Sequence, residues 1–274
     1  MIHVIKADGH RVPFDPSKIE ATCIRAGAST ALAKTILQSI SGKLYEGINT
    51  REIYKMVLSA LADETAHPEI KHRYRLKESI MLMGPTGFNF ESYIAQILEG
   101  HGYKIESIRT KLKGRCVEHE VDLIALSPTE TRRIIVECKY HNFSGAYTGL
   151  KEALYTHARF LDLNEDKRQL DDEMLISNTK ISQDALQFAK CVGQHVLSWR
   201  YPPERGLERL IEEKGLYPMT ILQLNAYELK AFAKINLMVA RDILKFEPRQ
   251  TSLKTGIGVA RILKLQDQVR QILR

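Results

Sequence analysis

The sequence predicts a mixed α/β protein, α+β overall, divided into residues 1–83, 84–203 and 204–274. Three patterns predict this fold class. Two short strands precede four helices in the first part, strands alternate with helices in the middle part, and helical patterning dominates the last part. The alternation in the middle favours a mixed sheet flanked by helices. With 274 residues, the chain also exceeds the usual size of one domain.

Composition and charge narrow the functional classes. Hydrophobic residues make up 44% and charged residues 27% of the chain, which is ordinary for a globular protein. The formal net charge of +7 is compatible with nucleic-acid binding without being diagnostic of it. The four cysteines form no CxxC pair, so we expect no disulfide framework or zinc site, and a reducing cytoplasm fits. No stretch approaches a membrane span, so we expect no membrane partner.

The first region is predicted to be a β-hairpin with a small helical bundle. Apolar residues at 3–5 and 11–14 indicate two strands around the turn Asp8-Gly9. Asp15-Pro16 is a favourable helix start, because Asp caps and Pro suits the first turn. Helices are then expected at 17–26, 30–44, 50–64 and 69–82. The third helix has apolar residues at every third or fourth position, as a buried helix face requires.

Four short motifs give this region a family resemblance: Val4-Ile5-Lys6-x-Asp8-Gly9, Phe14-Asp15-x-x-Lys18-Ile19, Ile48-Asn49-Thr50-x-x-Ile53 and Tyr74-Arg75. Together they resemble the ATP-cone, a regulatory nucleotide-binding domain. The resemblance implies ATP or dATP as a regulatory ligand in a site lined by Val4, Lys6, Lys18 and Thr50. The two ammonium groups suit phosphates, and Thr50 offers a hydroxyl at a helix N-terminus.

The chain departs from the cone pattern at one position. Many cones have Lys-Arg-Asp-Gly where this chain has Lys6-Ala7-Asp8-Gly9, so an arginine is missing, although Arg11 offers a substitute. A degenerate cone that folds without binding nucleotide is the alternative. The chain has no G-x-x-x-x-G-K-[ST] motif, so it does not encode a P-loop motor. A bound nucleotide is therefore expected to regulate.

The middle region contains an unusual cluster of charges on predicted strands. Two apolar runs, 121–126 and 134–136, flank a polar segment with a proline and predict a β-hairpin or two-strand unit. Side chains alternate along a strand, so Glu137 and Lys139 share a face beside the strand that begins with Asp122. Strands normally avoid such residues. Paired carboxylates suit Mg²⁺, and Lys139 could activate water or neutralise transition-state charge. A surface salt bridge is the alternative.

Asp122 and the run Val136-Glu137-Cys138-Lys139-Tyr140 resemble the PD-(D/E)XK nuclease signature, in its Mrr-type restriction branch. The resemblance extends from the helix after Gly87, which carries Glu91, to Trp199. The proline that names the motif is absent here, since Glu120-Val121 precedes Asp122. The resemblance implies that Asp122 and Glu137 hold Mg²⁺ (or Mn²⁺), that Glu91 supports the metal or its water, and that Lys139 assists water attack.

The remainder of the middle region is predicted from pattern alone. Residues 140–147 are either a DNA-contacting loop or an ordinary connection. The helix expected at 148–163 has an apolar stripe that predicts a core face, comprising Leu150, Leu154, His157, Ala158 and Leu161. His157 in that stripe is expected to be a satisfied core histidine. A strand at 173–177, a helix at 183–192 and a strand at 195–199 complete the region.

The last region is predicted to be helical, with an amphipathic turn at 207–211 and helices at 226–233, 237–244 and 259–273. The segment Lys254-Thr255-Gly256-Ile257-Gly258 faintly resembles the hairpin of helix-hairpin-helix modules, whose backbone N–H groups contact phosphates. A plain interhelical turn is the alternative. This region is expected to bind DNA, to dimerise or to cover the nuclease sheet.

Taken together, these patterns predict a cytoplasmic, metal-dependent DNA endonuclease of restriction or repair type, regulated by nucleotide. DNA and nucleotide are the expected partners, and self-association to a homo-oligomer stays open. A hypothesis from another class is a catalytically silent, nucleotide-responsive DNA-binding or regulatory protein. A third reading, a junction-resolving or repair nuclease, uses the same catalytic residues.

Overall fold

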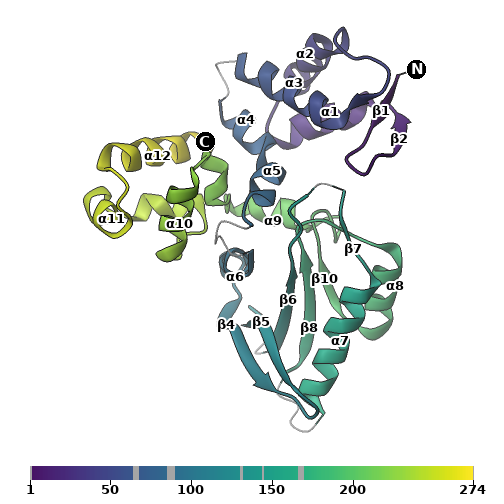
Figure 1. Cartoon of the computed structure of the whole chain (residues 1–274), viewed down its shortest axis with the longest axis vertical. Coiled ribbons are helices and arrows are strands. Elements are labelled where there is room, and N and C mark those ends of the chain that lie inside the picture. Colours follow the sequence, from purple (N-terminus) through teal and green to yellow (C-terminus); the bar gives the residue numbers. More distant parts are fainter. Residues whose placement is uncertain are drawn as a thin grey trace.

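The computed structural model describes residues 2–63, 68–84, 90–129, 132–143, 145–165 and 170–273. The three predicted regions follow one another through the structure (Figure 1), with the first region at the top, the five-stranded sheet of the middle region at the bottom, and the last region at the side between them. The predicted turn at 84–87 and the segment 87–89 before Glu91 lie largely outside the described residues, as do residues 130–131 of the polar hairpin segment.

The first region forms the expected hairpin and helices. Its elements are β1 (His3–Ile5), β2 (Arg11–Pro13), α1 (Pro16–Arg25), α2 (Thr30–Ser41), β3 (Ile48–Asn49), α3 (Thr50–Asp63), α4 (Pro68–Tyr74) and α5 (Leu76–Met81). Asp15 caps α1 by accepting from Ser17 N–H at 3.1 Å, and Ser29 caps α2 by accepting from Leu32 N–H at 3.1 Å. These caps satisfy amide donors that lack partners within the helix.

Two features of the first region differ from the prediction. Strand β3, which the sequence analysis missed, pairs parallel to β1, so the sheet order is β2-β1-β3. The single helix predicted at 69–82 is divided at Arg75, whose ψ of 1° departs from helical geometry. Helix α5 thereby takes its own direction and carries the chain toward the middle region.

The middle region is a five-stranded mixed sheet in the order β10-β8-β6-β5-β4. Its elements are α6 (Phe90–Gly100), β4 (Lys104–Lys113), β5 (Glu118–Leu126), β6 (Arg133–Lys139), β7 (Tyr147–Thr148), α7 (Leu150–Asn164), β8 (Asp172–Ser177), β9 (Lys180–Ile181), α8 (Gln183–Val192) and β10 (His195–Leu197). Strands β4, β5 and β6 pair antiparallel, whereas β6, β8 and β10 pair parallel. Helix α6 covers one face and α7 with α8 the other (Figure 1).

The core face of α7 is not the one that the sequence predicted. Leu150, Leu154 and Leu161 are 37%, 46% and 54% exposed. The buried residues are instead Ala153, Thr156, Arg159 and Leu163. Helical spacing identified an apolar stripe but not the face that docks. The small Ala153 and Thr156 allow α7 to approach the sheet closely, and this brings Arg159 over the central strands.

The last region contains α9 (Leu207–Lys214), the 3₁₀ turn η1 (Met219–Leu222), α10 (Ala226–Lys234), the 3₁₀ turn η2 (Ala240–Lys245), α11 (Pro248–Thr255) and α12 (Val259–Ile272). The helix predicted at 237–244 is therefore a 3₁₀ turn, and α11 was not predicted. Gly215, Asn236 and Gly256 each adopt positive φ where a helix ends. Such residues let the chain reverse after a helix.

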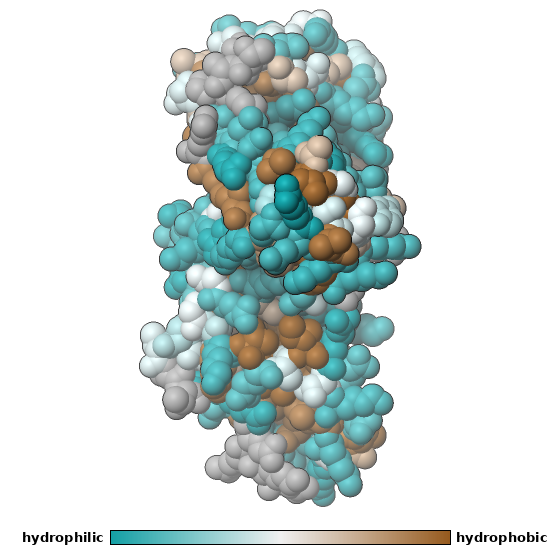
Figure 2. Space-filling model, turned by 90° about the vertical axis from the view of Figure 1, so that its left-hand side faces the viewer, coloured by the Kyte–Doolittle hydropathy of each residue, from teal (hydrophilic) through white to brown (hydrophobic). Residues whose placement is uncertain are grey.

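This last region packs on the other two. Thr220 Oγ1 donates to the Ser79 carbonyl at 2.6 Å, Tyr93 OH donates to the Leu216 carbonyl at 2.8 Å, and its apolar residues join the core of α6. Figure 2 views the molecule from the side on which the last region lies, and that surface is largely hydrophilic with separate apolar patches. One role that the structure gives this region is thus to cover the α6 layer of the five-stranded sheet.

Candidate active site and nucleotide cavities

The geometry of the site begins where β5 and β6 stop pairing. Leu123 lies opposite Val136 as the final pair of that ladder, so Asp122 and Glu137 follow directly on the two strands. The Asp122 Oδ2 accepts a hydrogen bond from Cys138 N–H at 2.7 Å, in place of a backbone carbonyl. The fold therefore fixes one carboxylate oxygen of Asp122 and brings it beside Glu137.

Glu137 is buried, with 6% of the residue exposed, and it pairs with two cations. Lys139 Nζ lies 3.2 Å from Oε1, and Arg159 Nη1 donates to Oε2. A buried carboxylate is costly unless it is paired and hydrogen-bonded, so these two cations explain how Glu137 is tolerated in the sheet. The Lys139 side chain is 36% exposed, so its ammonium remains accessible from solvent.

Arg159 is the functional neighbour that the sequence analysis missed. It is 8% exposed on α7, its Nη2 donates to Tyr155 OH at 2.8 Å, and its guanidinium lies 4.6 Å from the centre of the Tyr155 ring. These contacts hold Arg159 toward Glu137. In the sequence, Arg159 is spaced so that it shares a helix face with Thr156 and Leu163. This spacing indicates a buried arginine only if that face is known to be the one that packs on the sheet.

The electrostatics of the site favour a bound cation. The pKa of Asp122 is raised to about 6, chiefly by burial and also by the negative charges of Glu137 and Glu91, while the Cys138 N–H and Arg159 oppose the rise. Glu91 lies in the first turn of α6 and is half-buried. The negative charges of the other two predicted carboxylates, Glu137 and Glu91, therefore both act on Asp122.

The donor set fits Mg²⁺. Among the described residues there is no group of three or more His, Cys, Asp or Glu able to hold a metal ion as a complete cage. Mg²⁺ does not need one, because it commonly binds one or two carboxylates and fills its other positions with water and substrate phosphate. Asp122 and Glu137 supply the two carboxylates, and their mutual repulsion is the feature that a divalent cation would relieve.

Two other polar features near the site are structural. Arg109, with φ of 51°, occupies the β4 register position opposite Asp122, between the pairs formed by Ile108 and Thr110. His157 Nδ1 lies 2.5 Å from Glu173 Oε1, so His157 is the satisfied core histidine that was expected. It lies on α7, on the same face of the sheet as Glu137, and its described partner is Glu173 rather than the carboxylates of the cluster.

The four predicted nucleotide-binding residues divide into two groups. Lys6 and Thr50 line common cavities beside β1 and the start of α3. Val4 is 5% exposed in the core of the first region, so its side chain does not face those cavities. Lys18 is exposed on α1, with its Nζ 3.4 Å from Asp15 Oδ2, and it lines neither cavity.

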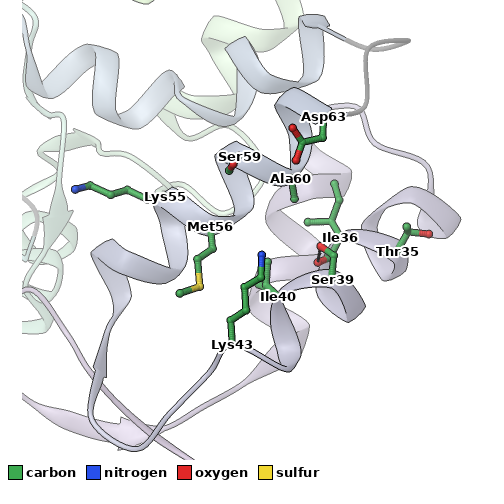
Figure 3. Close-up of a pocket in the computed structure, with 10 residues that line it drawn as sticks. All are labelled: Thr35, Ile36, Ser39, Ile40, Lys43, Lys55, Met56, Ser59, Ala60 and Asp63. Atoms are coloured by element: carbon green, nitrogen blue, oxygen red, sulfur yellow. Dashed lines mark hydrogen bonds between the residues drawn. The ribbon is translucent and has the colours of Figure 1, made fainter.

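A separate cavity of about 430 Å³ lies between α2 and α3 (Figure 3). Its polar lining includes Thr35, Ser39, Lys43, Ser59 and Asp63, none of which the sequence analysis singled out. Figure 3 shows Lys43 reaching upward along the groove, whereas Lys55 extends away from the other labelled side chains. The cavity shares Lys55 with the larger cavity that contains Lys6 and Thr50.

Comparisons with known proteins agree with both predicted domains. An ATP cone domain model matches residues 2–78, and a restriction endonuclease model matches residues 83–199. An uncharacterized protein from Archaeoglobus fulgidus is 41% identical over 151 residues, which are 55% of this chain and 83% of that protein. A crystal structure of a protein of unknown function is 33% identical, with a TM-score of 0.59 over 67% of this chain and 96% of that chain.

A repair endonuclease from Pyrococcus abyssi is 14% identical over 37% of this chain and 39% of its own, with a TM-score of 0.29, which is too low to support an argument. The protein belongs to a restriction-endonuclease-like family, with an ATP cone domain fused ahead of the nuclease domain. Within the described part of the chain, helices fall short of the length and apolar character needed to cross a membrane.

Proposed function

We propose that this protein is a DNA endonuclease that hydrolyses phosphodiester bonds with Mg²⁺ or Mn²⁺ and is regulated by ATP or dATP at its cone domain. The observation that carries the proposal is that Asp122 lies close enough to buried Glu137 for their charges to interact, beside the accessible Lys139. A scaffold that only binds DNA has no need to place two carboxylates and a lysine together at the end of a central strand.

The chain's own residues have distinct roles in this mechanism. Asp122 and Glu137 would hold the metal, which when bound supplies Lewis acidity toward the scissile phosphate and lowers the pKa of a water molecule. The Cys138 N–H orients Asp122. Lys139 would donate a hydrogen bond to the attacking water or to a phosphate oxygen as negative charge develops. Arg159 positions Glu137 from the opposite side.

The regulatory part of the proposal rests on the cone. Lys6 and Thr50 line one cavity, where an ammonium and a hydroxyl at the start of α3 suit a phosphate. The catalytic cluster lies in the nuclease domain, whereas Lys6 and Thr50 lie in the cone, so each set of residues can be tested alone by substitution.

The test is nicking of supercoiled plasmid DNA with Mg²⁺ or Mn²⁺, with and without ATP and dATP. Lys139→Ala should abolish nicking, while Lys151→Ala, an exposed lysine on α7, should retain it. Methylated, unmethylated and branched substrates separate a restriction role from a repair role. Equal nicking by Lys139→Ala and the wild-type protein would refute the active-site assignment.

One observation favours the silent regulatory alternative. Glu137 is already neutralised by Lys139 and Arg159, so this cluster is stable without a metal. Binding to DNA and to nucleotide, with no cleavage of any of these substrates under either metal, would establish the alternative.

A further inference from the structure

A cavity of about 210 Å³ lies between the cone hairpin and the nuclease domain. Lys6 and Thr50 line it from the cone, Lys77 from α5, and Tyr147 and Lys180 from the nuclease domain. Figure 1 shows why these segments meet, since the loop that leads to β7 rises from the sheet toward the cone.

The two domains touch at this cavity. Gly145 has a φ of 96°, and a Cβ added there would lie 3.5 Å from Asp8 N and 3.6 Å from Asp8 Cβ. The tight turn of the cone hairpin therefore packs against the loop before β7. Glycine is suited to this position because positive φ is strained for other residues.

The cavity is lined by more positive than negative side chains, and its lysines are not held in close ion pairs with described residues. Within the described part of the chain, no carboxylate lies within 4.0 Å of the ammonium groups of Lys6, Lys77 or Lys180. Lys77 Nζ is 5.5 Å from the Trp199 ring centre and Lys180 Nζ is 5.7 Å from that of Tyr147, so aromatic faces are their nearest described partners. The cavity's carboxylate, Asp8, is itself engaged with His10 at 3.1 Å.

The pKa of Lys77 reflects its burial and the positive charges around it. This pKa is lowered to about 8, chiefly by burial and also by the positive charges of Arg200 and Lys180, while Glu208 opposes the shift. Three lysines around a partly desolvated cavity with one lining carboxylate favour the binding of an anion.

The neighbouring cavity on the cone alone shares Lys6 and Thr50 with this one and has a volume of about 580 Å³. It continues along β3 and the first turn of α3, past Asn49 and Arg51. One ligand can therefore occupy the cone cavity with its nucleoside part and extend its phosphates toward the nuclease domain.

We infer that the cavity between the domains binds the phosphate chain of a nucleoside triphosphate, so that Lys77 and Lys180 complete a site which the cone begins with Lys6 and Thr50. This inference rests on the proposed regulatory nucleotide and adds how that nucleotide reaches the nuclease. The ligand is a bridge, and its phosphates hold the loop before β7 against the cone hairpin.

A buried polar chain connects this cavity with the catalytic strand. Thr179, in the cavity wall, lies 3.2 Å from Ser177 Oγ, which lies 2.7 Å from Thr148 Oγ1. Thr148 Oγ1 is 3.0 Å from His141 Nε2, two residues beyond Lys139. A ligand that restrains β7 and β9 therefore restrains the end of β6, which carries the catalytic pair.

The test is calorimetric binding of ATP, inorganic tripolyphosphate and adenosine to the full chain. Lys180→Gln and Lys77→Gln should each weaken ATP and tripolyphosphate binding about tenfold or more, since hydrogen bonds to charged groups are worth that much. Adenosine binding should stay the same. Lys43→Gln, in the separate α2–α3 cavity, is the matched control and should bind ATP like the wild-type protein.

A second measurement guards against a folding artefact. Lys180 is exposed, so its replacement should leave the unfolding temperature unchanged. In the wild-type protein, ATP should slow amide exchange at residues 145–148. Wild-type ATP affinity in both glutamine variants would overturn the bridge while leaving a cone-only nucleotide site intact. No ATP binding by the wild-type protein would overturn the bridge and the proposed regulation together, but plasmid nicking without nucleotide would still test the nuclease.

Discussion

The nuclease site and the interdomain cavity handle charge in opposite ways. Glu137 is buried and already paired with Lys139 and Arg159. The lysines of the cavity come from both sides of a domain boundary, and one carboxylate, Asp8, lines the cavity with them. The comparison teaches that the sheet preforms the proposed catalytic cluster, whereas the proposed nucleotide site is assembled from separate segments of two domains.

The largest expected effect concerns the preformed catalytic pair. Glu137→Gln should lower the nicking rate by about a thousandfold or more, because one metal-binding charge and the partner of Lys139 are lost together. The measurement is plasmid nicking under Mg²⁺. Glu173→Gln is a matched control, because that buried glutamate is paired with His157 and Gln194 rather than with Lys139 or Arg159. Nicking by Glu137→Gln at the wild-type rate would mean that the sheet does not form the catalytic centre.

The next effect concerns stability. Arg159→Met removes a buried cation and leaves Glu137 with one partner, which should cost about 3–5 kcal/mol of unfolding free energy. Urea denaturation measures this loss. The double variant Arg159→Met with Glu137→Gln should recover part of it, because the unpaired carboxylate is then gone. An undiminished unfolding free energy in Arg159→Met would show that the pair is not formed in solution.

The third prediction is that Mg²⁺ stabilises the protein through the carboxylates of the nuclease site. At a Mg²⁺ concentration of about one hundred times the dissociation constant, the wild-type protein should gain about 2.7 kcal/mol of stability. The same titration of Glu137→Gln should give little or no gain. Thermal unfolding with and without EDTA provides the measurement. An equal gain in both proteins would place the metal elsewhere.

The smallest expected effect is a difference in ATP affinity between variants of two cone lysines, Lys6 and Lys18. Lys6→Ala should weaken ATP binding about tenfold, because Lys6 lines both cavities. Lys18→Ala should change it less than about threefold, since an exposed ion pair such as that with Asp15 contributes little. Fluorescence titration with a labelled ATP analogue measures both. A larger loss in Lys18→Ala would mean that the nucleotide lies over α1.

The sequence correctly predicted the parts of the fold that depend on local patterns of residues. The family of both domains is confirmed, and strand alternation correctly placed Glu137 and Lys139 on one face. It missed β3, because two residues become a strand only by pairing with β1, more than forty positions away. It also chose the wrong face of α7, since spacing alone does not say which stripe docks.

The rest of the candidate site depended on tertiary contacts. Arg159 and Glu137 are 22 positions apart in the sequence, and no local motif predicts their contact. Lys77 and Lys180 are unremarkable in sequence and become a pair only when α5 and β9 meet beside the cone. The nucleotide-binding assignments of Val4 and Lys18 stay predictions, with Val4 in the core and Lys18 outside the two cavities.

The central claim is that Asp122 and Glu137 form a metal-dependent phosphodiesterase centre. The most direct measurement compares nicking of supercoiled plasmid by the wild-type protein and by Asp122→Asn, which preserves the shape and the acceptor for Cys138 N–H. With Mg²⁺ or Mn²⁺, we predict nicking by the wild-type protein, its loss on adding EDTA, and none by Asp122→Asn. Metal-dependent nicking at equal rates in both proteins would contradict the claim.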